Sequence, residues 1–340
     1  MSLNIALIGA GNISRVHLSA LRDLADGTVI GLYDADPQRA QQRATEFGIQ
    51  RIYASQEELL GDPNVQVVAV LVPPFLHAPV AIAALEAGKH VVTEKPMAGS
   101  LAECDSMIEA GRRAGRRMLT VQNRIYSPAY EAARDLIQKG AIGTVFLGQT
   151  DGFEGPDTVF RTSWLASGLP GNGVLMAQAV HPAYALRWML GEVDQVSATF
   201  AGRKVVDTVE EDTAIVTFRF ASGVIVSMTA TFGLKNGPFD HAIKIFGSDG
   251  YVEIRGQAGV PPLRTISPMT YGDRNIHEVE IPDVSNHADQ FRAMWQDYLR
   301  SFESGQPGRV DELDGRKAVE MILAAHRSSE QGAAVKLPLG

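Results

Sequence analysis

The sequence predicts an α/β domain with a parallel sheet, followed by an α+β domain with a large, mostly antiparallel open sheet. In the first part, short apolar runs alternate with longer helical patterns, as in a sheet whose parallel strands are joined by crossover helices. In the second part, apolar and polar residues alternate over long runs, which is typical of antiparallel strands with one covered face. We place the boundary at residue 123, so the expected domains are 1–123 and 124–340.

The expected strands of the first domain are short and almost wholly apolar, and they fall at residues 5–8, 29–33, 67–72, 91–93 and 118–121. Helical patterns fill the intervals between them, at residues 13–24, 37–47, 78–87 and 101–114. Gly88 and Gly115 stand directly before a strand, where glycine commonly ends a helix.

The second domain begins with an expected helix and continues with two clearly alternating strands, 214–220 and 224–232. One face of each strand is apolar, and the opposite face carries Thr, Ser and Arg. Ala221-Ser222-Gly223 between them predicts a hairpin turn. The other expected elements are helices at 129–138, 286–303 and 313–331 and strands at 194–201, 241–246, 250–255 and 277–281. The last helix is a candidate to pack back on the first domain.

Composition disfavours several classes of partner. A formal net charge of −8 at pH 7 argues against a nucleic-acid partner, because phosphate binding needs a basic face, and against an anionic membrane. No apolar run reaches the ~18 residues of a membrane span, and no signal-peptide pattern precedes the first strand. Cys104 is the only cysteine, so no intrachain disulfide can form. We therefore expect a cytoplasmic protein.

The first strand runs into Gly9-Ala10-Gly11-Asn12-Ile13-Ser14, which opens a helix. This is the glycine pattern of a dinucleotide-binding Rossmann domain, with a small serine in place of the third glycine. Gly9 permits the tight turn, and Gly11 lets the backbone approach a pyrophosphate at the positive end of the helix. The alternative is a glycine-rich turn in a domain that binds no dinucleotide. The position after a strand favours binding.

Asp34 ends the second strand, where an acidic side chain would accept hydrogen bonds from the adenosine ribose. A carboxylate at this place repels a 2′-phosphate, so NAD is the expected cofactor and NADP the alternative. Arg39 lies five residues further on and would soften this preference if it reached the phosphate.

The strand at 91–93 ends in Glu94-Lys95-Pro96. Ligands of open α/β sheets bind beyond the carboxyl ends of the strands, so Lys95 is expected where nicotinamide and substrate meet. A lysine in such a place can exchange a proton with a substrate hydroxyl. Pro96 fixes the local turn, through a trans or a cis bond. The alternative for Lys95 is an ordinary surface lysine.

The Glu94-Lys95-Pro96 motif, at this spacing after the glycine pattern, resembles the Gfo/Idh/MocA family of sugar and inositol dehydrogenases. Further segments agree with that resemblance, namely 72–77 (a T-P-N-x-x-H-like loop), 88–91, 140–143, 171–175 and 328–332. The resemblance covers essentially the whole chain. It implies an NAD(P)-dependent dehydrogenase acting on CH–OH groups, with cofactor contacts from Gly9, Gly11, Asn12, Ile13, Asp34, Pro73, His77, Glu94 and Lys95.

The family's second catalytic element usually reads D-x-G-x-H, and this chain has Ala177-Gln178-Ala179-Val180-His181 at that place. The resemblance therefore assigns catalysis to Lys95 and His181, and leaves Ala177 where the family has a proton-handling aspartate. We favour His181 as the base, since an unperturbed imidazole titrates near pH 6.5. Pro182 directly after it would break a helix over 174–190, as at a functional site or at the junction of two short helices.

Further substrate contacts are expected from Asn123 and Arg124, which follow the last strand of the first domain, and from Tyr184 on the His181 helix. Arg161 and Trp164 lie in a glycine- and proline-bearing stretch that is a candidate lid. Structural roles are the alternatives for all of them. We interpret His17 as structural. His241, His277 and His287 are scattered and show no ligand-like spacing, so no metal site is expected.

Three functions follow. The first is an NAD-dependent oxidoreductase that transfers hydride between a secondary alcohol of a sugar, inositol or related polyol and nicotinamide. The second is a redox-neutral sugar-modifying enzyme, an isomerase, lyase or glycosidase, that holds NAD tightly and uses it transiently. The third, disfavoured because Lys95 is present, is a catalytically silent NAD-binding regulator. By resemblance, the open sheet face is expected to form a homodimer or homotetramer.

Overall fold

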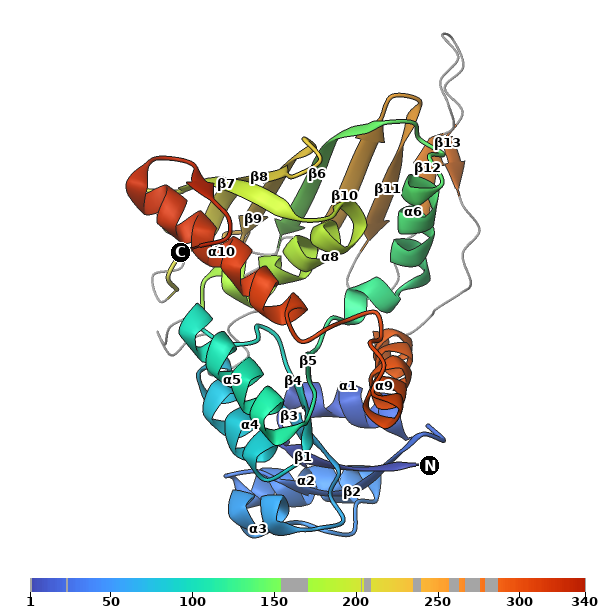
Figure 1. Cartoon of the computed structure of the whole chain (residues 1–340), viewed down its shortest axis with the longest axis vertical. Coiled ribbons are helices and arrows are strands. Elements are labelled where there is room, and N and C mark those ends of the chain that lie inside the picture. Colours follow the sequence, from blue (N-terminus) through green and yellow to red (C-terminus); the bar gives the residue numbers. More distant parts are fainter. Residues whose placement is uncertain are drawn as a thin grey trace. The chain divides into compact units, whose positions relative to one another are not determined.

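The computed structural model describes residues 2–339, apart from residues 23 and 203 and the segments 154–170, 205–208, 235–239, 257–262, 267–275 and 279–286. The chain forms two compact units (Figure 1). The first comprises Met1–Asn123 with Ala288–Val319, and the second comprises Arg124–His287 with Glu320–Gly340. Among the described residues, no helix combines the length and the hydropathy needed to cross a bilayer.

The first unit contains a five-stranded parallel sheet in the order β2-β1-β3-β4-β5. Its strands are β1 (Leu3–Ile8), β2 (Gly27–Tyr33), β3 (Val67–Val70), β4 (His90–Thr93) and β5 (Met118–Thr120). The chain moves from β1 to one side for β2 and to the other side for β3, so the strand order reverses at β1. Ligands of doubly wound sheets bind at this reversal, beyond the carboxyl ends of the strands.

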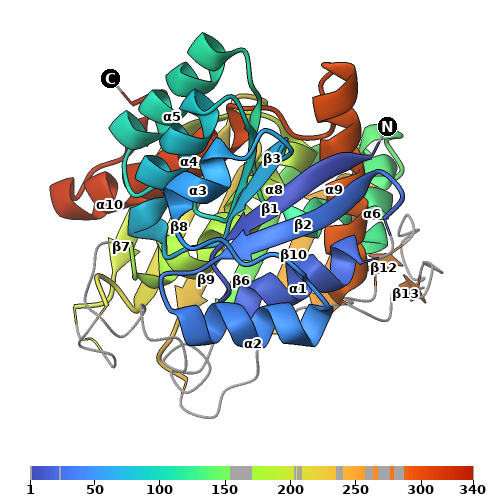
Figure 2. The ribbon, with the colours of Figure 1, turned by 90° about the horizontal axis from the view of Figure 1, so that it is seen from below.

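The helices of this sheet are α1 (Asn12–Leu21), α2 (Pro37–Phe47), α3 (Gln56–Gly61), α4 (His77–Glu86) and α5 (Leu101–Ala114). Figure 2 shows α4 and α5 on the side of β1 and β2 opposite to α1. The boundaries of α2 follow from local chemistry. The Asp36 side chain accepts the N–H groups of Gln38 and Arg39, Pro37 is the first helical residue, and Gly48 ends the helix with φ of 70°.

The helix α9 (His287–Ser304) belongs to the first unit, as does the beginning of α10 (Asp314–Gln331). Trp295 and Tyr298 on α9 are fully buried. The indole N–H of Trp295 donates to Nδ1 of His17 at 3.1 Å, and the Tyr298 hydroxyl donates to the Thr120 carbonyl at 2.6 Å. These aromatic side chains complete the core of the first unit. The sequence-based prediction placed one unbroken second domain over 124–340. In the structure, residues 288–319 belong to the first unit instead.

The second unit contains one open sheet, with nine strands among the described residues, in the order β13-β12-β11-β10-β6-β9-β8-β7-β14. Among the strands that the structure describes in this sheet, only the β6–β9 pair is parallel, which confirms the mostly antiparallel sheet predicted from the alternation. Its strands are β6 (Val145–Phe153), β7 (Val193–Phe200), β8 (Thr213–Phe220), β9 (Ile225–Thr231), β10 (Asp240–Gly247), β11 (Gly250–Gly256), β12 (Leu263–Ile266), β13 (Ile276–Glu278) and β14 (Val335–Lys336).

One face of this sheet is covered and the other is open. Val216 and Phe218 on β8 and Val226 on β9 are fully buried, whereas Ile215 is 57% exposed and Ile225 is 45% exposed. The helices of the unit are α6 (Pro128–Gln138), α8 (Val180–Leu190) and the C-terminal part of α10, and Figure 1 shows α8 lying across the sheet.

Candidate functional site

The glycine turn after β1 has the backbone geometry that dinucleotide binding requires. Gly9 has φ of 105°, and a Cβ there would stand 2.4 Å from the Leu71 carbonyl oxygen, so no other residue fits. A Cβ on Gly11 would meet no protein atom within 4 Å. The glycine at this position therefore keeps open space beside the N-terminus of α1, where a pyrophosphate would approach.

Ser14 and Arg43 hold this turn in place through hydrogen bonds. The Ser14 hydroxyl is fully buried and donates to the Gly11 carbonyl at 2.6 Å. Arg43 on α2 donates through Nε to the Ser14 hydroxyl at 2.8 Å and through Nη2 to the Gly11 carbonyl at 3.1 Å. Sequence reasoning missed Arg43, because an arginine inside an amphipathic helix looks like a solvated surface residue until its partner in the fold is known.

Asp34 connects the glycine turn to the end of β2. Its Oδ2 accepts the Ala10 N–H at 2.7 Å, and its Oδ1 accepts the Asp36 N–H at 2.8 Å. A carboxylate oxygen has two lone pairs, so both oxygens retain the capacity to accept a ribose hydroxyl. Arg39, half exposed, places Nη1 3.6 Å from Oδ1 of Asp34 and Nη2 3.3 Å from Oδ2 of Asp36.

His77 at the start of α4 joins the loop after β3 to the loop after β4. Its Nδ1 lies 2.7 Å from the Pro96 carbonyl oxygen, and its Nε2 lies 2.9 Å from the Val72 carbonyl oxygen. Burial lowers the pKa of His77, although both carbonyl contacts oppose this. Both ring nitrogens are directed at backbone carbonyls, so His77 holds the two loops together, and the cofactor contact expected of it stays a prediction. Pro73 precedes it in the same loop.

Glu94 lies at the end of a buried chain of three side chains. His17 places Nε2 2.9 Å from Oε1 of Glu94, and its Nδ1 accepts the indole N–H of Trp295. Because Nδ1 is an acceptor, Nε2 carries the ring hydrogen and donates it to Glu94. Oε2 of Glu94 accepts the Lys95 N–H at 3.0 Å. Burial acts to raise the pKa of Glu94, but the His17 hydrogen bond and the Lys95 charge outweigh it and hold the pKa low.

Glu94 therefore supports the backbone of Lys95, and the cofactor contact expected of it stays a prediction. The His17 ring is fully buried, in agreement with the structural role predicted for it. Lys95 itself is partly exposed and is joined to Pro96 by a cis peptide bond. Asn123, buried after β5, donates from Nδ2 to Oε1 of Gln290 on α9 at 3.1 Å.

In the second unit, His181 is the second residue of α8 and is partly exposed. The segment before it, Leu175–Ala179, is a π-helical turn in which the Val180 N–H reaches the Leu175 carbonyl. Helix 174–190 is therefore continuous, and Pro182 lies at its third α-helical residue rather than at the first position of a separate helix. Ala177 and Tyr184 are both buried in this run.

The start of the His181 helix is fixed by the segment before β8. Oε1 of Glu211 accepts the Leu175 N–H at 2.8 Å, and the Glu211 carbonyl accepts the Val174 N–H at 2.9 Å. Asn172 accepts the Glu210 N–H at 3.0 Å. Burial raises the pKa of Glu211 to about 8. Sequence reasoning missed Glu211, because no local pattern links it to a helix so far away in the chain.

Two expected substrate contacts, Arg161 and Trp164, lie outside the described residues. Arg124 is the first residue of the second unit and is partly exposed.

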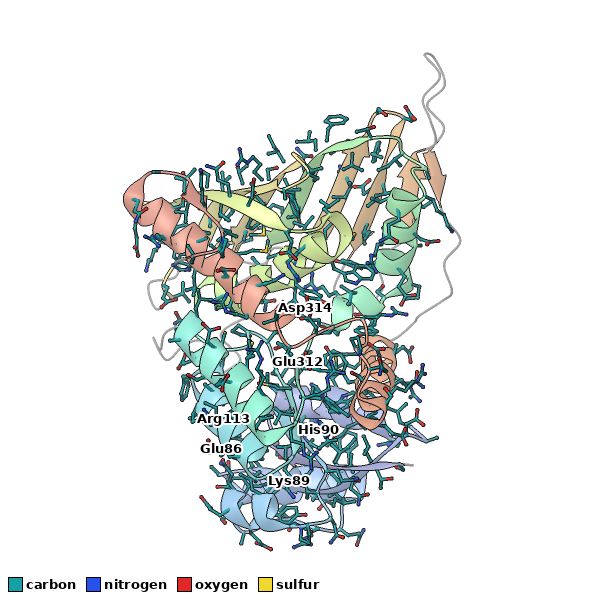
Figure 3. The ribbon with its side chains drawn as sticks, viewed as in Figure 1. Glu86, Lys89, His90, Arg113, Glu312 and Asp314 are labelled. Atoms are coloured by element: carbon teal, nitrogen blue, oxygen red, sulfur yellow. The ribbon has the colours of Figure 1, made fainter. Side chains whose placement is uncertain are left out.

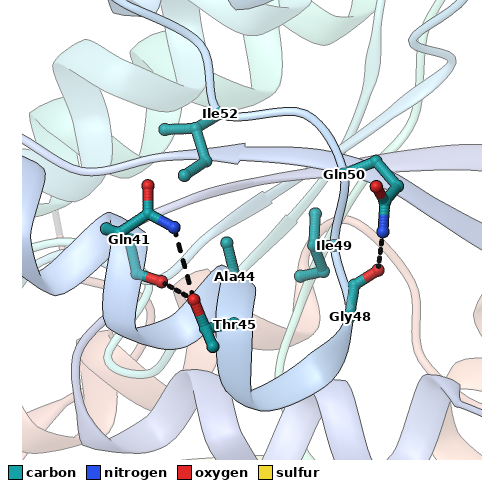
Figure 4. Close-up of a pocket in the computed structure, with 7 residues that line it drawn as sticks. All are labelled: Gln41, Ala44, Thr45, Gly48, Ile49, Gln50 and Ile52. Carbon is teal, nitrogen blue, oxygen red and sulfur yellow. Dashed lines mark hydrogen bonds between the residues drawn. The ribbon is translucent and has the colours of Figure 1, made fainter.

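A surface cavity of about 540 Å³ lies beside the C-terminal half of α2 (Figure 4), lined by Gln41, Ala44, Thr45, Gly48, Ile49, Gln50 and Ile52. None of these side chains titrates, so this cavity has no means of moving a proton.

Known proteins resemble this chain along its whole length. Residues 3–123 match the model of an oxidoreductase family with an NAD-binding Rossmann fold, and residues 130–253 match the GFO/IDH/MocA C-terminal domain. Myo-inositol 2-dehydrogenase of Thermotoga maritima is 27% identical, and inositol 2-dehydrogenase of Acidothermus cellulolyticus is 29% identical. The alignments cover 98% of this chain in both cases, and 98% and 94% of those proteins.

Among solved structures, levoglucosan dehydrogenase in complex with NADH superposes with a TM-score of 0.89 at 22% identity, over 100% of both chains. At this identity the likeness shows a shared fold. The two family models together span most of the chain, from the start of β1 to β11. The chain belongs to the GFO/IDH/MocA family of oxidoreductases with an NAD-binding Rossmann domain.

Proposed function

We propose that this protein is an NAD-dependent dehydrogenase that transfers hydride between a secondary alcohol of a sugar, inositol or related polyol and nicotinamide. The placement of Lys95 carries the proposal. In a parallel sheet the carboxyl ends of the strands share one edge, so Lys95 after β4 stands at the same edge as the glycine turn after β1. The inositol 2-dehydrogenases among the relatives support a polyol substrate.

Bound NAD would supply the hydride acceptor, and the chain's own residues would manage orientation and the proton. When the substrate C–H bond gives up its hydride, the hydroxyl loses its proton and a carbonyl forms. His181 takes that proton, and Lys95 donates a hydrogen bond to the same oxygen. Asn123, Arg124 and Tyr184 are the further residues to which we assign substrate contacts. Arg161 and Trp164 are candidates from the sequence alone.

Spectrophotometry tests this proposal. The purified protein is mixed with NAD and a panel of inositols, sugars, sugar acids and anhydrosugars, and the absorbance of reduced nicotinamide is followed. Lys95→Ala and His181→Ala should each lower kcat by at least about 100-fold, the usual range for a proton-handling group. Lys139→Ala, at an exposed lysine directly after α6, is the control and should keep full activity. Full turnover in both site variants would refute the assignment.

A redox-neutral enzyme is the second candidate, and Ala177 is the observation that favours it. The resemblance places a proton-handling aspartate at this position, and the buried Ala177 cannot act as one. An enzyme of this kind would convert its substrate while the absorbance of reduced nicotinamide stays flat. Chromatography of the same reactions separates the two proposals, because only the redox-neutral enzyme gives product without net NADH.

We also propose that the protein works in the cytoplasm as a homodimer or homotetramer formed through the open sheet face. The exposed Ile215 and Ile225 on that face support the assembly. Fractionation of cells that express the protein tests its location, and light scattering tests its mass.

A further inference from the structure

Three potential metal ligands converge in the second unit, and the proposed mechanism uses none of them. Glu210 and Glu211 stand directly before β8, and His326 lies on α10. One donor atom from each residue, two carboxylate oxygens and one ring nitrogen, lies within 4.8 Å of the other two. Carboxylate and imidazole groups are common ligands of divalent metal ions.

Glu211 distinguishes this group from an ordinary acidic patch. The residue is only 3% exposed, and its Oε1 is occupied by the Leu175 N–H. Its Oε2 is buried and has no hydrogen-bond partner. Native proteins rarely leave a buried carboxylate oxygen unsatisfied, so the orphaned atom points to a missing ligand. The ring Nε2 of His326 lies 3.4 Å from Oε2, in a position that makes no hydrogen bond.

That separation fits a shared ion. Two donor atoms bound at about 2.1 Å to one tetrahedral ion stand roughly 3.4 Å apart. Oε2 of Glu211 and Nε2 of His326 already have this spacing of 3.4 Å. Glu210 is exposed, so its side chain is free to turn toward the ion and complete a set of three protein ligands, with water in the fourth place.

We propose that Glu210, Glu211 and His326 bind a divalent transition-metal ion, with Zn²⁺ as the preferred occupant. Two carboxylates and one imidazole suit Zn²⁺, whereas Mg²⁺ prefers octahedral oxygen coordination and keeps most of its waters. The ion would join α10 to the segment before β8. Through Glu211 it would also stabilise the start of the helix that carries His181. This site is independent of the proposed function, and it differs from our sequence-based expectation of no metal site.

Isothermal titration of the chelator-treated, full-length protein with Zn²⁺ tests the site. We expect saturable binding of one ion per chain, and a raised melting temperature that chelator reverses. Co²⁺ in place of Zn²⁺ should give the visible absorption bands of a tetrahedral site. Glu210→Gln and His326→Gln should each weaken Zn²⁺ binding at least about tenfold. Because Glu210 is exposed, its variant should melt like the wild type in the presence of chelator.

Glu109→Gln is the matched control, since Glu109 is another exposed acid and lies on α5 in the first unit, outside the ligand set. It should bind Zn²⁺ like the wild type. Two results would overturn the proposal: the absence of saturable binding by the wild type, or wild-type affinity in both Glu210→Gln and His326→Gln. Neither readout depends on enzyme activity, so failure here leaves the dehydrogenase proposal untouched.

Discussion

At the residue scale, the carboxylate of Asp34 has one observed task, and we assign a second one to it. It accepts the Ala10 and Asp36 N–H groups and so holds the glycine turn against the end of β2. The same oxygens are the acceptors we assign to the adenosine ribose. Since the carboxylate is already fixed by two backbone donors, we expect it to bind the ribose without reorganisation and to repel a 2′-phosphate.

Replacing Asp34 by serine should separate the two cofactors. We expect Asp34→Ser to lower kcat/KM for NAD by about 10- to 100-fold, corresponding to about 1–3 kcal/mol of lost hydrogen bonding. NADP should lose less, because the repulsion is removed as well. Asp36→Asn is the control, since it neutralises the neighbouring acid and keeps an oxygen to cap α2. Equal losses for both cofactors would mean that Asp34 only supports the turn.

The site residues that sequence predicted are those with a local pattern. Gly9, Gly11, Asp34 and Lys95 lie at fixed places relative to strands, so chain position alone indicates their chemistry. The residues that hold these site residues in place could not be predicted from position in the chain. Arg43 contacts the glycine turn across 32 residues, and Trp295 reaches His17 across 278 residues. Such pairs exist only once the core has formed, and one sequence carries no signal for them.

At the scale of elements, periodicity predicted the long helices and most of the long strands, but it missed β6, a nine-residue strand in the middle of the large sheet. The alternation in 214–220 and 224–232 reappears as the antiparallel pair β8 and β9. Elements too short to show a period were not predicted, such as α3 and the two-residue strand β14. The π-helical turn Leu175–Ala179 could not be predicted from the sequence either, because its residues are those of an ordinary apolar helix.

The turn before this π-helical segment depends on a glycine. A Cβ on Gly173 would stand 2.1 Å from Oε2 of Glu211, in the buried contact that fixes the helix start. Gly173→Ala should therefore destabilise the protein by about 2 kcal/mol or more, the range for overpacking a buried site, and should lower kcat through His181.

Gly202→Ala is the matched control, because a Cβ there meets nothing within 4 Å. Urea unfolding of both variants gives the change in free energy, and the NAD assay gives kcat. Equal stability of the two variants would show that Glu211 moves aside at no cost.

At the scale of the whole molecule, stability should depend on pH through His90. Its ring stacks on Phe302, with 4.8 Å between ring centroids, and its Nδ1 accepts the Arg117 N–H at 3.1 Å. His90 is labelled in Figure 3. Burial, together with the nearby charge of Arg116, lowers the pKa of His90 from 6.5 to about 4. The unfolded chain therefore binds a proton at a higher pH than the folded chain does, and acid favours unfolding.

The contribution of neutral His90 to the free energy of unfolding should be fully present above pH 6.5 and should be lost as the pH drops toward 4. Across that window the wild type should lose about 2 kcal/mol relative to His90→Asn, after allowance for partial exposure of the ring. Asparagine keeps an acceptor for Arg117 and does not titrate. Urea unfolding of both proteins at several pH values measures the difference. Parallel curves would mean that His90 titrates alike in the folded and unfolded chains.

The open face of the large sheet bears on the assembly of the molecule. Leu147 on β6 pairs in register with Ile225 on β9 and with Phe246 on β10, so apolar residues form a row across three neighbouring strands. On β8, Ile215 is 57% exposed, and Leu147 and Ile225 are 37% and 45% exposed. Such a row on one face of a sheet is typical of a surface that another chain covers.

Ile215→Lys should therefore reduce the molecular mass in solution to that of a smaller assembly, because each contact across a symmetric interface would bury the new charge twice. Light scattering of the purified variant measures the mass. Ile52→Lys is the control: Ile52 is also an exposed isoleucine, at 36%, but lies in the first unit. A wild type that is already monomeric, or an Ile215→Lys variant that keeps the wild-type mass, would show that this face is not the interface.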